Sequence, residues 1–117
     1  MKHEPSRLAP LSAASLHILL ALAGDELHGY GIMQEAARQS AGKYKLGPGT
    51  LYDNLKKLMA AGIVEESRRQ PAGEDPRRRY YRLTGLGRLV LAEEISRLER
   101  VLHEAKAVLQ GTRTKIA

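Results

Sequence analysis

The stretch Gly47–Gly62, GPGTLYDNLKKLMAAG, decides the fold of this 117-residue chain. Pro48 suits the first position of a helix, where no hydrogen bond needs its missing N–H. Leucines recur after it at spacings of four and three, which places three of them on one helical face: Leu51, Leu55 and Leu58. Gly62 can end the helix because glycine tolerates a left-handed backbone. The pattern predicts a helix over 47–61 with a buried stripe, a polar outer face and an open N-terminus, as a recognition helix for the DNA major groove has.

Two shorter helices are expected before this stretch. Ser12 is a suitable N-cap for a helix that runs to about Ala23. A second helix is expected to begin near His28 or Gly29 and to end before Gly42. Its predicted inward stripe comprises Tyr30, Met33 and Ala37. Two short helices, a turn and the 47–61 helix make a helix-turn-helix.

A β-hairpin is expected directly after the 47–61 helix. Val64–Arg69 begins with β-branched residues and alternation, and Arg78–Leu83 is the expected returning strand. The loop between them, QPAGEDP, contains turn-forming proline and glycine. Alternation directs Tyr81 and Leu83 toward the core. A hairpin in this place is the wing of a winged helix-turn-helix.

A long helix is expected to follow, with Thr84 as its cap. Apolar residues recur along it at alternating spacings of four and three, which is the heptad seam of a coiled coil: Leu91, Ile95, Leu98, Leu102, Ala105 and Leu109. A helix of roughly 25 residues is about 37 Å long, more than a small domain covers. The seam therefore predicts self-association, although part of it can pack on the domain's own first helix.

Together these elements predict a mainly α fold with a small β-hairpin, namely a winged helix-turn-helix plus a long C-terminal dimerisation helix. A chain of this length makes one compact unit. We expect a flexible arm over 1–10, the winged DNA-binding domain over 11–83, the dimerisation helix over 84–110 and a disordered tail over 111–117.

The formal net charge of +6 is unevenly placed. Basic residues gather in 43–57 and in 67–82, whereas the two signs balance between 83 and 110. Such a concentration indicates a polyanionic partner, and with a recognition helix this partner is double-stranded DNA.

Several side chains have expected roles on DNA. The N–H groups at Gly49 and the Thr50 hydroxyl can bind phosphate or a base edge. Asn54 is a candidate base reader, because Asn can bond adenine at two points. Tyr52 either contacts a phosphate or packs against the wing. The complete expected DNA-binding set is Lys43, Lys45, Gly49, Thr50, Tyr52, Asn54, Lys56, Lys57, Arg77, Arg78 and Arg79.

Enzymatic and cofactor chemistry are not indicated. The chain has no cysteine, no phosphate-binding glycine loop and no evident nucleophile with its base. Asp25, Glu26 and His28 have no second histidine nearby, so we expect neither a metal nor a cofactor. No export signal or membrane span is evident, which predicts a cytoplasmic protein.

Three stretches together resemble the PadR family of bacterial transcriptional regulators: LHGYGI at 27–32, GPGTLYDNLKKLMAAGIVE at 47–65 and RRRYYRLTGLG at 77–87. The single helix after the wing is similar to the smaller branch of that family. The resemblance implies a homodimeric DNA-binding transcription factor, usually a repressor released by a signal. Some small members hold flat aromatic ligands between tryptophans, and this chain has no Trp.

Two other classes of function stay open. A winged-helix protein-interaction module without specific DNA binding predicts a neutral recognition face, which Lys43 and Lys45 do not support. An RNA-binding protein usually exposes stacking aromatics, whereas the tyrosines here stand mostly where the fold itself uses them. The sequence does not reveal the operator, the target genes or a small-molecule effector.

Overall fold

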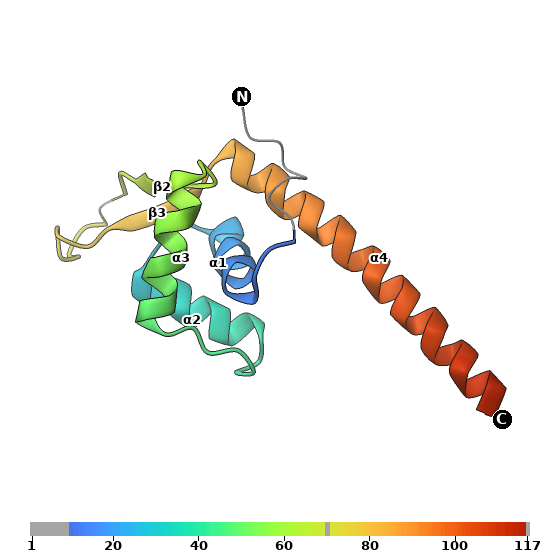
Figure 1. Ribbon diagram of the computed structural model, residues 1–117. Coiled ribbons are helices and arrows are strands. Elements are labelled where there is room, and N and C mark those ends of the chain that lie inside the picture. Colours follow the sequence, from blue (N-terminus) through green and yellow to red (C-terminus); the bar gives the residue numbers. More distant parts are fainter. Residues whose placement is uncertain (1–9, 70, 117) are drawn as a thin grey trace.

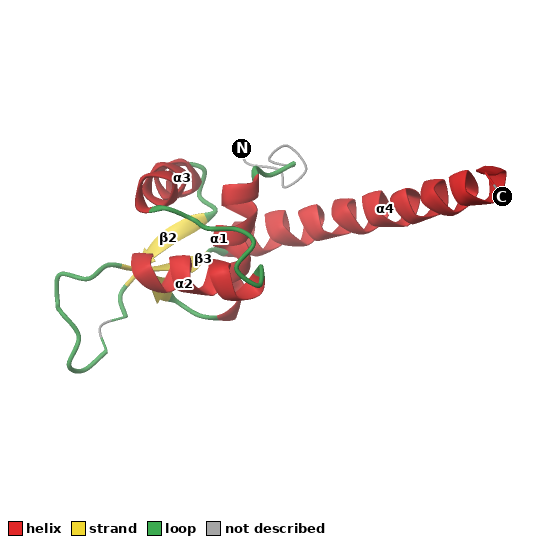
Figure 2. Ribbon diagram, turned by 90° about the horizontal axis from the view of Figure 1, so that it is seen from below, coloured by secondary structure: helices red, strands yellow, loops and turns green. Residues whose placement is uncertain are grey.

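The computed structural model describes residues 10–69 and 71–116, with side chains as far as Gly111. Most of the arm predicted over 1–10 therefore lies outside the described residues. The elements in chain order are α1 (Ala13–Gly24), β1 (Leu27–His28), α2 (Gly29–Gln39), α3 (Pro48–Ala60), β2 (Val64–Ser67), β3 (Tyr80–Leu83) and α4 (Gly85–Ile116). Three short helices pack around a small sheet, and α4 leaves this body as a long rod (Figure 1). The rod points away from the loop between β2 and β3, as the second view also shows (Figure 2).

An aliphatic core joins the three short helices to the sheet and to the start of α4. α1 begins after Ser12, whose hydroxyl accepts the Ser15 backbone N–H at 3.1 Å, so the predicted N-cap is confirmed. Complete burial of one aliphatic side chain contributes about 1.5–3 kcal/mol. The fully buried aliphatic residues include Ile18, Leu19, Leu22, Ile32, Leu51, Leu55, Ile63, Val64 and Val90.

α2 turns a different face to the core from the one predicted. Ile32 and Ala36 are fully buried, whereas Tyr30 is 60% exposed. The predicted inward stripe is therefore wrong by one position, and Met33 and Ala37 are only half-buried.

The start of α2 lies close to α3. A Cβ atom on Gly29 would overlap the hydroxyl group of Tyr52. A larger residue at position 29 would displace the Tyr52 side chain, so Gly29 lets that side chain lie against the start of α2.

α3 is the predicted recognition helix. Pro48 occupies its first turn, and its leucine stripe is buried as predicted. Gly62 follows the helix with φ of 77°. The Ile63 N–H then donates to the Leu58 carbonyl at 2.9 Å, which is the Schellman arrangement.

The sheet has three antiparallel strands in the order β1–β3–β2, one strand more than the predicted hairpin. β1 has two residues and pairs Leu27 with Tyr81. β2 ends at Ser67 and β3 begins at Tyr80, so both hairpin strands are shorter than predicted. Tyr81 and Leu83 are buried, as predicted.

The junction between β3 and α4 is tied to the end of α3. The Thr84 backbone N–H donates to the Ile63 carbonyl at 3.1 Å, and the Thr84 hydroxyl donates to the Gly62 carbonyl at 2.6 Å. That hydroxyl also accepts the Gly87 N–H at 3.0 Å, so the predicted cap is confirmed. A Cβ atom on Gly87 would overlap the Ile63 carbonyl oxygen, which shows how closely α4 begins against this turn.

Only the first turns of α4 are buried among the described residues. Leu91, predicted as the first residue of the dimer seam, is a residue of the domain core instead. Glu94 is 1% exposed; its carboxylate accepts two hydrogen bonds of 2.8 Å from Arg97 and one of 3.2 Å from the Leu11 N–H. The helix continues past its predicted end at 110 and reaches Ile116. No helix in the described part is both long and apolar enough to cross a bilayer.

Candidate nucleic-acid interface

The N-terminus of α3 is open to solvent. No side chain caps it at Gly47, and no atom lies within 4 Å of the position that a Cβ on Gly49 would take. Thr50 is exposed beside it. Backbone N–H groups at such a helix start carry partial positive charge and can bind an anion.

Four lysines stand around this helix start and along the outer face of α3. All four are exposed: Lys43, Lys45, Lys56 and Lys57. The salt bridges found between described residues use none of them. They therefore present positive charge that no carboxylate of the domain neutralises.

The Asn54 side chain, predicted to read a base, has partners within the protein. Its amide oxygen accepts the Ser15 hydroxyl at 3.1 Å, and its amide nitrogen donates to the Thr50 carbonyl at 2.8 Å. Each end of the amide keeps one further hydrogen-bonding position. Asn54 thus links α3 to α1 in this structure.

Three arginines of the wing, the loop between β2 and β3, are each paired with a carboxylate. The pairs are Arg77–Asp75 at 3.2 Å, Arg78–Glu74 at 2.8 Å and Arg79–Glu66 at 3.2 Å. The predicted cluster of free positive charge is thus partly neutralised. Exposed pairs of this kind contribute only about 0–1 kcal/mol, so a phosphate can replace the carboxylates at little cost.

Hydrogen bonds keep the wing carboxylates ionised. The Tyr80 hydroxyl and then the Arg78 guanidinium lower the pKa of Glu74 below its ordinary value. The side chain of Arg77 and then its backbone N–H lower the pKa of Asp75. Both groups are therefore negatively charged at neutral pH, and the wing carries less net positive charge than its arginines suggest.

A cleft of about 340 Å³ lies between the wing, the start of α2 and Tyr52, and we call it the wing cleft. Its lining residues are His28, Gly29, Tyr30, Tyr52, Arg77, Arg78, Arg79 and Tyr81. Sequence reasoning singled out Tyr52 and the arginines for this region but placed Tyr30 in the core. His28 was also missed, and the available signal was its position immediately before a helix start.

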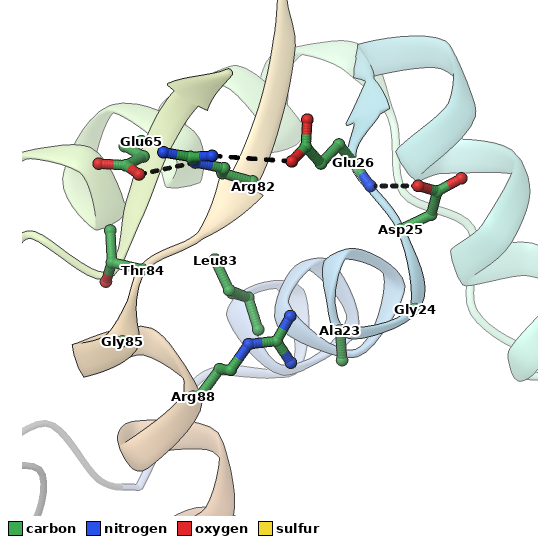
Figure 3. A pocket seen from close by; sticks show the side chains of 10 residues that line it. All are labelled: Ala23, Gly24, Asp25, Glu26, Glu65, Arg82, Leu83, Thr84, Gly85 and Arg88. Atoms are coloured by element: carbon green, nitrogen blue, oxygen red, sulfur yellow. Dashed lines mark hydrogen bonds and ion pairs between the residues drawn. The ribbon is translucent and has the colours of Figure 1, made fainter. Parts of the chain in front are cut away.

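A second hollow of about 550 Å³ lies between the end of α1 and the start of α4 (Figure 3). Arg82 of β3 crosses it, bonded to Glu65 of β2 at 2.7 Å and facing Glu26 at 3.8 Å. Arg88 of α4 extends toward the same space. The row of three charges links neighbouring strands of the sheet. Among the described residues, no three His, Asp or Glu side chains are grouped to hold a metal ion.

Comparison with known proteins leads to one family. Residues 18–93 match the model of the transcriptional regulator PadR-like family. The transcriptional regulator Rv3488 of Mycobacterium tuberculosis is 39% identical over 93 residues, which cover 80% of this chain and 82% of that protein.

Two solved structures have a similar fold. A PadR family transcription regulator from Clostridium difficile matches with a TM-score of 0.69 and 23% identity, over 84% of this chain and 99% of that one. PadR of Bacillus subtilis, solved in complex with operator DNA, matches with a TM-score of 0.62 and 26% identity. That match covers 74% of this chain and 48% of the Bacillus protein.

Proposed function

This chain belongs to the PadR-like family of transcriptional regulators, and from that premise we propose that it is a repressor that binds a pseudo-palindromic DNA operator as a homodimer. Family membership places it among regulators and not among enzymes. In the proposal α3 enters the major groove, the wing contacts the minor groove or the backbone, and the protein acts in the cytoplasm. The observation that carries it is the open N-terminus of α3 together with four exposed lysines, two before the helix and two in its second half, none of which forms a salt bridge with a described carboxylate.

The geometry of α3 suits contact with a groove. Three buried leucines fix its inner face, so its outer face is held rigidly. In the proposal Lys56 and Lys57 contact phosphates, and Thr50 contacts a phosphate or a base edge. The Asn54 oxygen is bonded to Ser15, so the exposed carboxylate of Asp53 is a second candidate for reading a base, as an acceptor for a cytosine amino group.

The outer part of α4 supports the homodimer. Past Leu91 the predicted seam projects beyond the domain, with Ile95 at 41%, Leu102 at 54% and Leu109 at 64% exposure. An open apolar strip runs along this part of the helix and comprises Val101, Ala105, Val108 and Leu109. A heptad stripe of this kind is buried by a second helix of the same pattern. Two copies would then present their α3 helices to successive major grooves, about 34 Å apart.

Enrichment of duplexes from a random-sequence library tests DNA recognition. We expect the selected duplex to contain two inverted half-sites and to bind roughly 10³-fold more tightly than a scrambled duplex at physiological salt. Equal weak binding to both would contradict a sequence-reading regulator. No binding even at low salt would favour the protein-interaction module, and preference for single-stranded RNA would favour the RNA-binding alternative.

Transcription in vitro from a promoter that overlaps the selected site tests the proposed repression. Adding the protein should lower transcription, and a rise would indicate an activator.

Sedimentation equilibrium tests the dimer. Leu102→Asp places a charge in the seam and should give a monomer, whereas Ala107→Asp places the same charge on the opposite face of α4 and should leave the dimer intact. A dimeric L102D protein would show that the seam is not the interface.

A further inference from the structure

Two hydrogen-bond donors are directed at the single imidazole of His28. Its Nδ1 lies 3.0 Å from the Gly31 backbone nitrogen, and its Nε2 lies 3.1 Å from the NH1 nitrogen of Arg78. A neutral imidazole has one acceptor nitrogen, and a protonated imidazole has none. Gly31 N–H and the guanidinium can only donate, so at most one of these two contacts is a hydrogen bond.

The start of α2 decides which contact is the hydrogen bond. The Gly31 N–H is one of the helix-start donors that have no carbonyl partner within the helix, and His28 Nδ1 is its cap. The ring hydrogen of His28 is then on Nε2, so that two hydrogen-bond donors, this Nε2–H and the Arg78 guanidinium, face each other. Burial and then the charge of Arg78 lower the pKa of His28, while Glu74 raises it, so the ring is neutral near pH 7. The Tyr80 ring packs against the imidazole in a T-shaped arrangement, with the ring centroids 5.2 Å apart.

An acceptor placed between His28 and Arg78 would replace this repulsion with two hydrogen bonds. Glu74 already provides an acceptor for Arg78. Its Oε1 accepts hydrogen bonds from the Arg78 guanidinium at 2.8 Å and from the Tyr80 hydroxyl at 3.1 Å. The wing cleft beside them measures about 340 Å³. That equals roughly ten water molecules at about 30 Å³ each, which is ample for a phosphate group.

The wing cleft also lies on the path expected for a DNA strand. When α3 occupies a major groove and the wing meets the next minor groove, the strand that separates the grooves passes between α3 and the wing. The walls of the wing cleft are Tyr52 of α3, the wing arginines and the start of α2. Tyr30 and Tyr52, 60% and 50% exposed, bring two phenol groups to it.

We infer that the wing cleft holds one backbone phosphate of bound DNA, which accepts hydrogen bonds from the Arg78 guanidinium and from the Nε2–H of His28. The inference rests on the proposed DNA-binding function and adds an anion site and a role for His28 to it. Glu74 is the competitor, because it occupies Arg78 when DNA is absent. The Arg78–Glu74 pair is partly exposed, at 46% and 35%, so the exchange costs little.

Salt-dependent binding to a labelled 20-base-pair duplex tests the site. R78A should weaken binding roughly tenfold and lower the slope of log K against log salt by about 1, the signature of one lost phosphate contact. H28N keeps a good helix cap but removes Nε2, and should weaken binding about three- to tenfold. The double variant should lose less affinity than the sum of the two single losses, because both donors act on one phosphate. E74Q should tighten binding, because it removes the competing charge.

Arg38 provides the matched control. It is an exposed arginine paired with Glu35 at 2.6 Å, at the opposite end of α2 from the wing cleft. R38A should leave both the affinity and the salt slope unchanged. The ring-nitrogen NMR signals of His28, assigned by their loss in H28N, should show the Nε2–H tautomer in the DNA complex.

The possible results distinguish a failure of the phosphate site in the wing cleft from a failure of the proposed DNA-binding function. A wild-type protein that binds no duplex at low salt overturns the proposed function itself. A wild-type protein that binds, with R78A and H28N behaving like R38A, overturns only the wing cleft. Independent effects of the two variants, or an Nδ1–H tautomer in the complex, also overturn it.

Discussion

Replacement of Gly87 by alanine should destabilise the protein, although helices normally favour alanine. A Cβ atom there would overlap the Ile63 carbonyl oxygen and lie 3.1 Å from the Ile63 carbonyl carbon. The obstacle is backbone, held by the turn at Gly62, so it cannot rotate away as the end of a flexible side chain would. α4 would have to move.

The magnitude follows from three contributions. Alanine gains about 1 kcal/mol over glycine within a helix. Forced overlap costs about 1–3 kcal/mol. Movement of α4 also weakens the two hydrogen bonds from Thr84 to the carbonyls of Gly62 and Ile63, each of which contributes about 0.5–1.5 kcal/mol. We expect G87A to lower the free energy of unfolding by about 1–5 kcal/mol, the upper value applying if both hydrogen bonds are lost.

Urea denaturation followed by circular dichroism measures this loss, at one protein concentration because association shifts apparent stability. Gly85 is the control, since no atom lies within 4 Å of its hypothetical Cβ. G85A should be as stable as the wild type or gain up to about 1 kcal/mol. A G87A protein as stable as G85A would refute the reasoning, because it would mean that α4 can leave Ile63 freely.

Two further predictions concern buried contacts. Glu94→Gln keeps an acceptor for the Leu11 N–H but removes the charge that faces Arg97, and should cost about 1–3 kcal/mol in thermal or urea unfolding. Because the Arg97 hydrogen bonds hold the pKa of Glu94 below its ordinary 4.5, this contribution is complete above pH 4.5 and is lost as the pH falls through the lowered value. The stability gap between wild type and E94Q should therefore shrink on acidification, and a constant gap down to strongly acidic pH would contradict the assignment. Gly29→Ala directs a Cβ at the Tyr52 hydroxyl and should lower the melting temperature; G29A/Y52F should recover part of the loss, and no recovery would place the clash elsewhere.

The sequence predicted the elements whose signals are local. Pro48, Gly62 and the leucines between them set the bounds and the buried face of α3 without help from the rest of the chain. β1 has two residues and shows no alternation of its own, because its pairing with β3 is a tertiary contact. The inward face of α2 was missed for a related reason, since its packing against α1 and α3 is also a tertiary contact.

The candidate site likewise combines features that local sequence predicts with contacts between distant residues that it does not predict. The lysines around α3 are exposed, as charge placement alone indicates. Asn54 and the wing arginines have partners that charge and periodicity do not reveal. Ser15 lies 39 residues before Asn54, and Glu66 lies 13 residues before Arg79. The conflict at His28 likewise depends on Arg78, which is 50 residues away in the sequence.

The hydrogen bonds at Thr84 couple the movement of α4 to that of α3. Its 32 residues extend about 48 Å at 1.5 Å per residue, and its base is bonded to the turn where α3 ends, with no flexible linker between them. A sideways displacement of about 4 Å at the far end turns the base by only about 5°. A sideways movement of the far end of α4 therefore rotates α3 only slightly, whereas a movement of the first turns of α4 is passed to α3 in full. The contacts around Thr84 and Gly87 thus have the greatest influence on the orientation of α3.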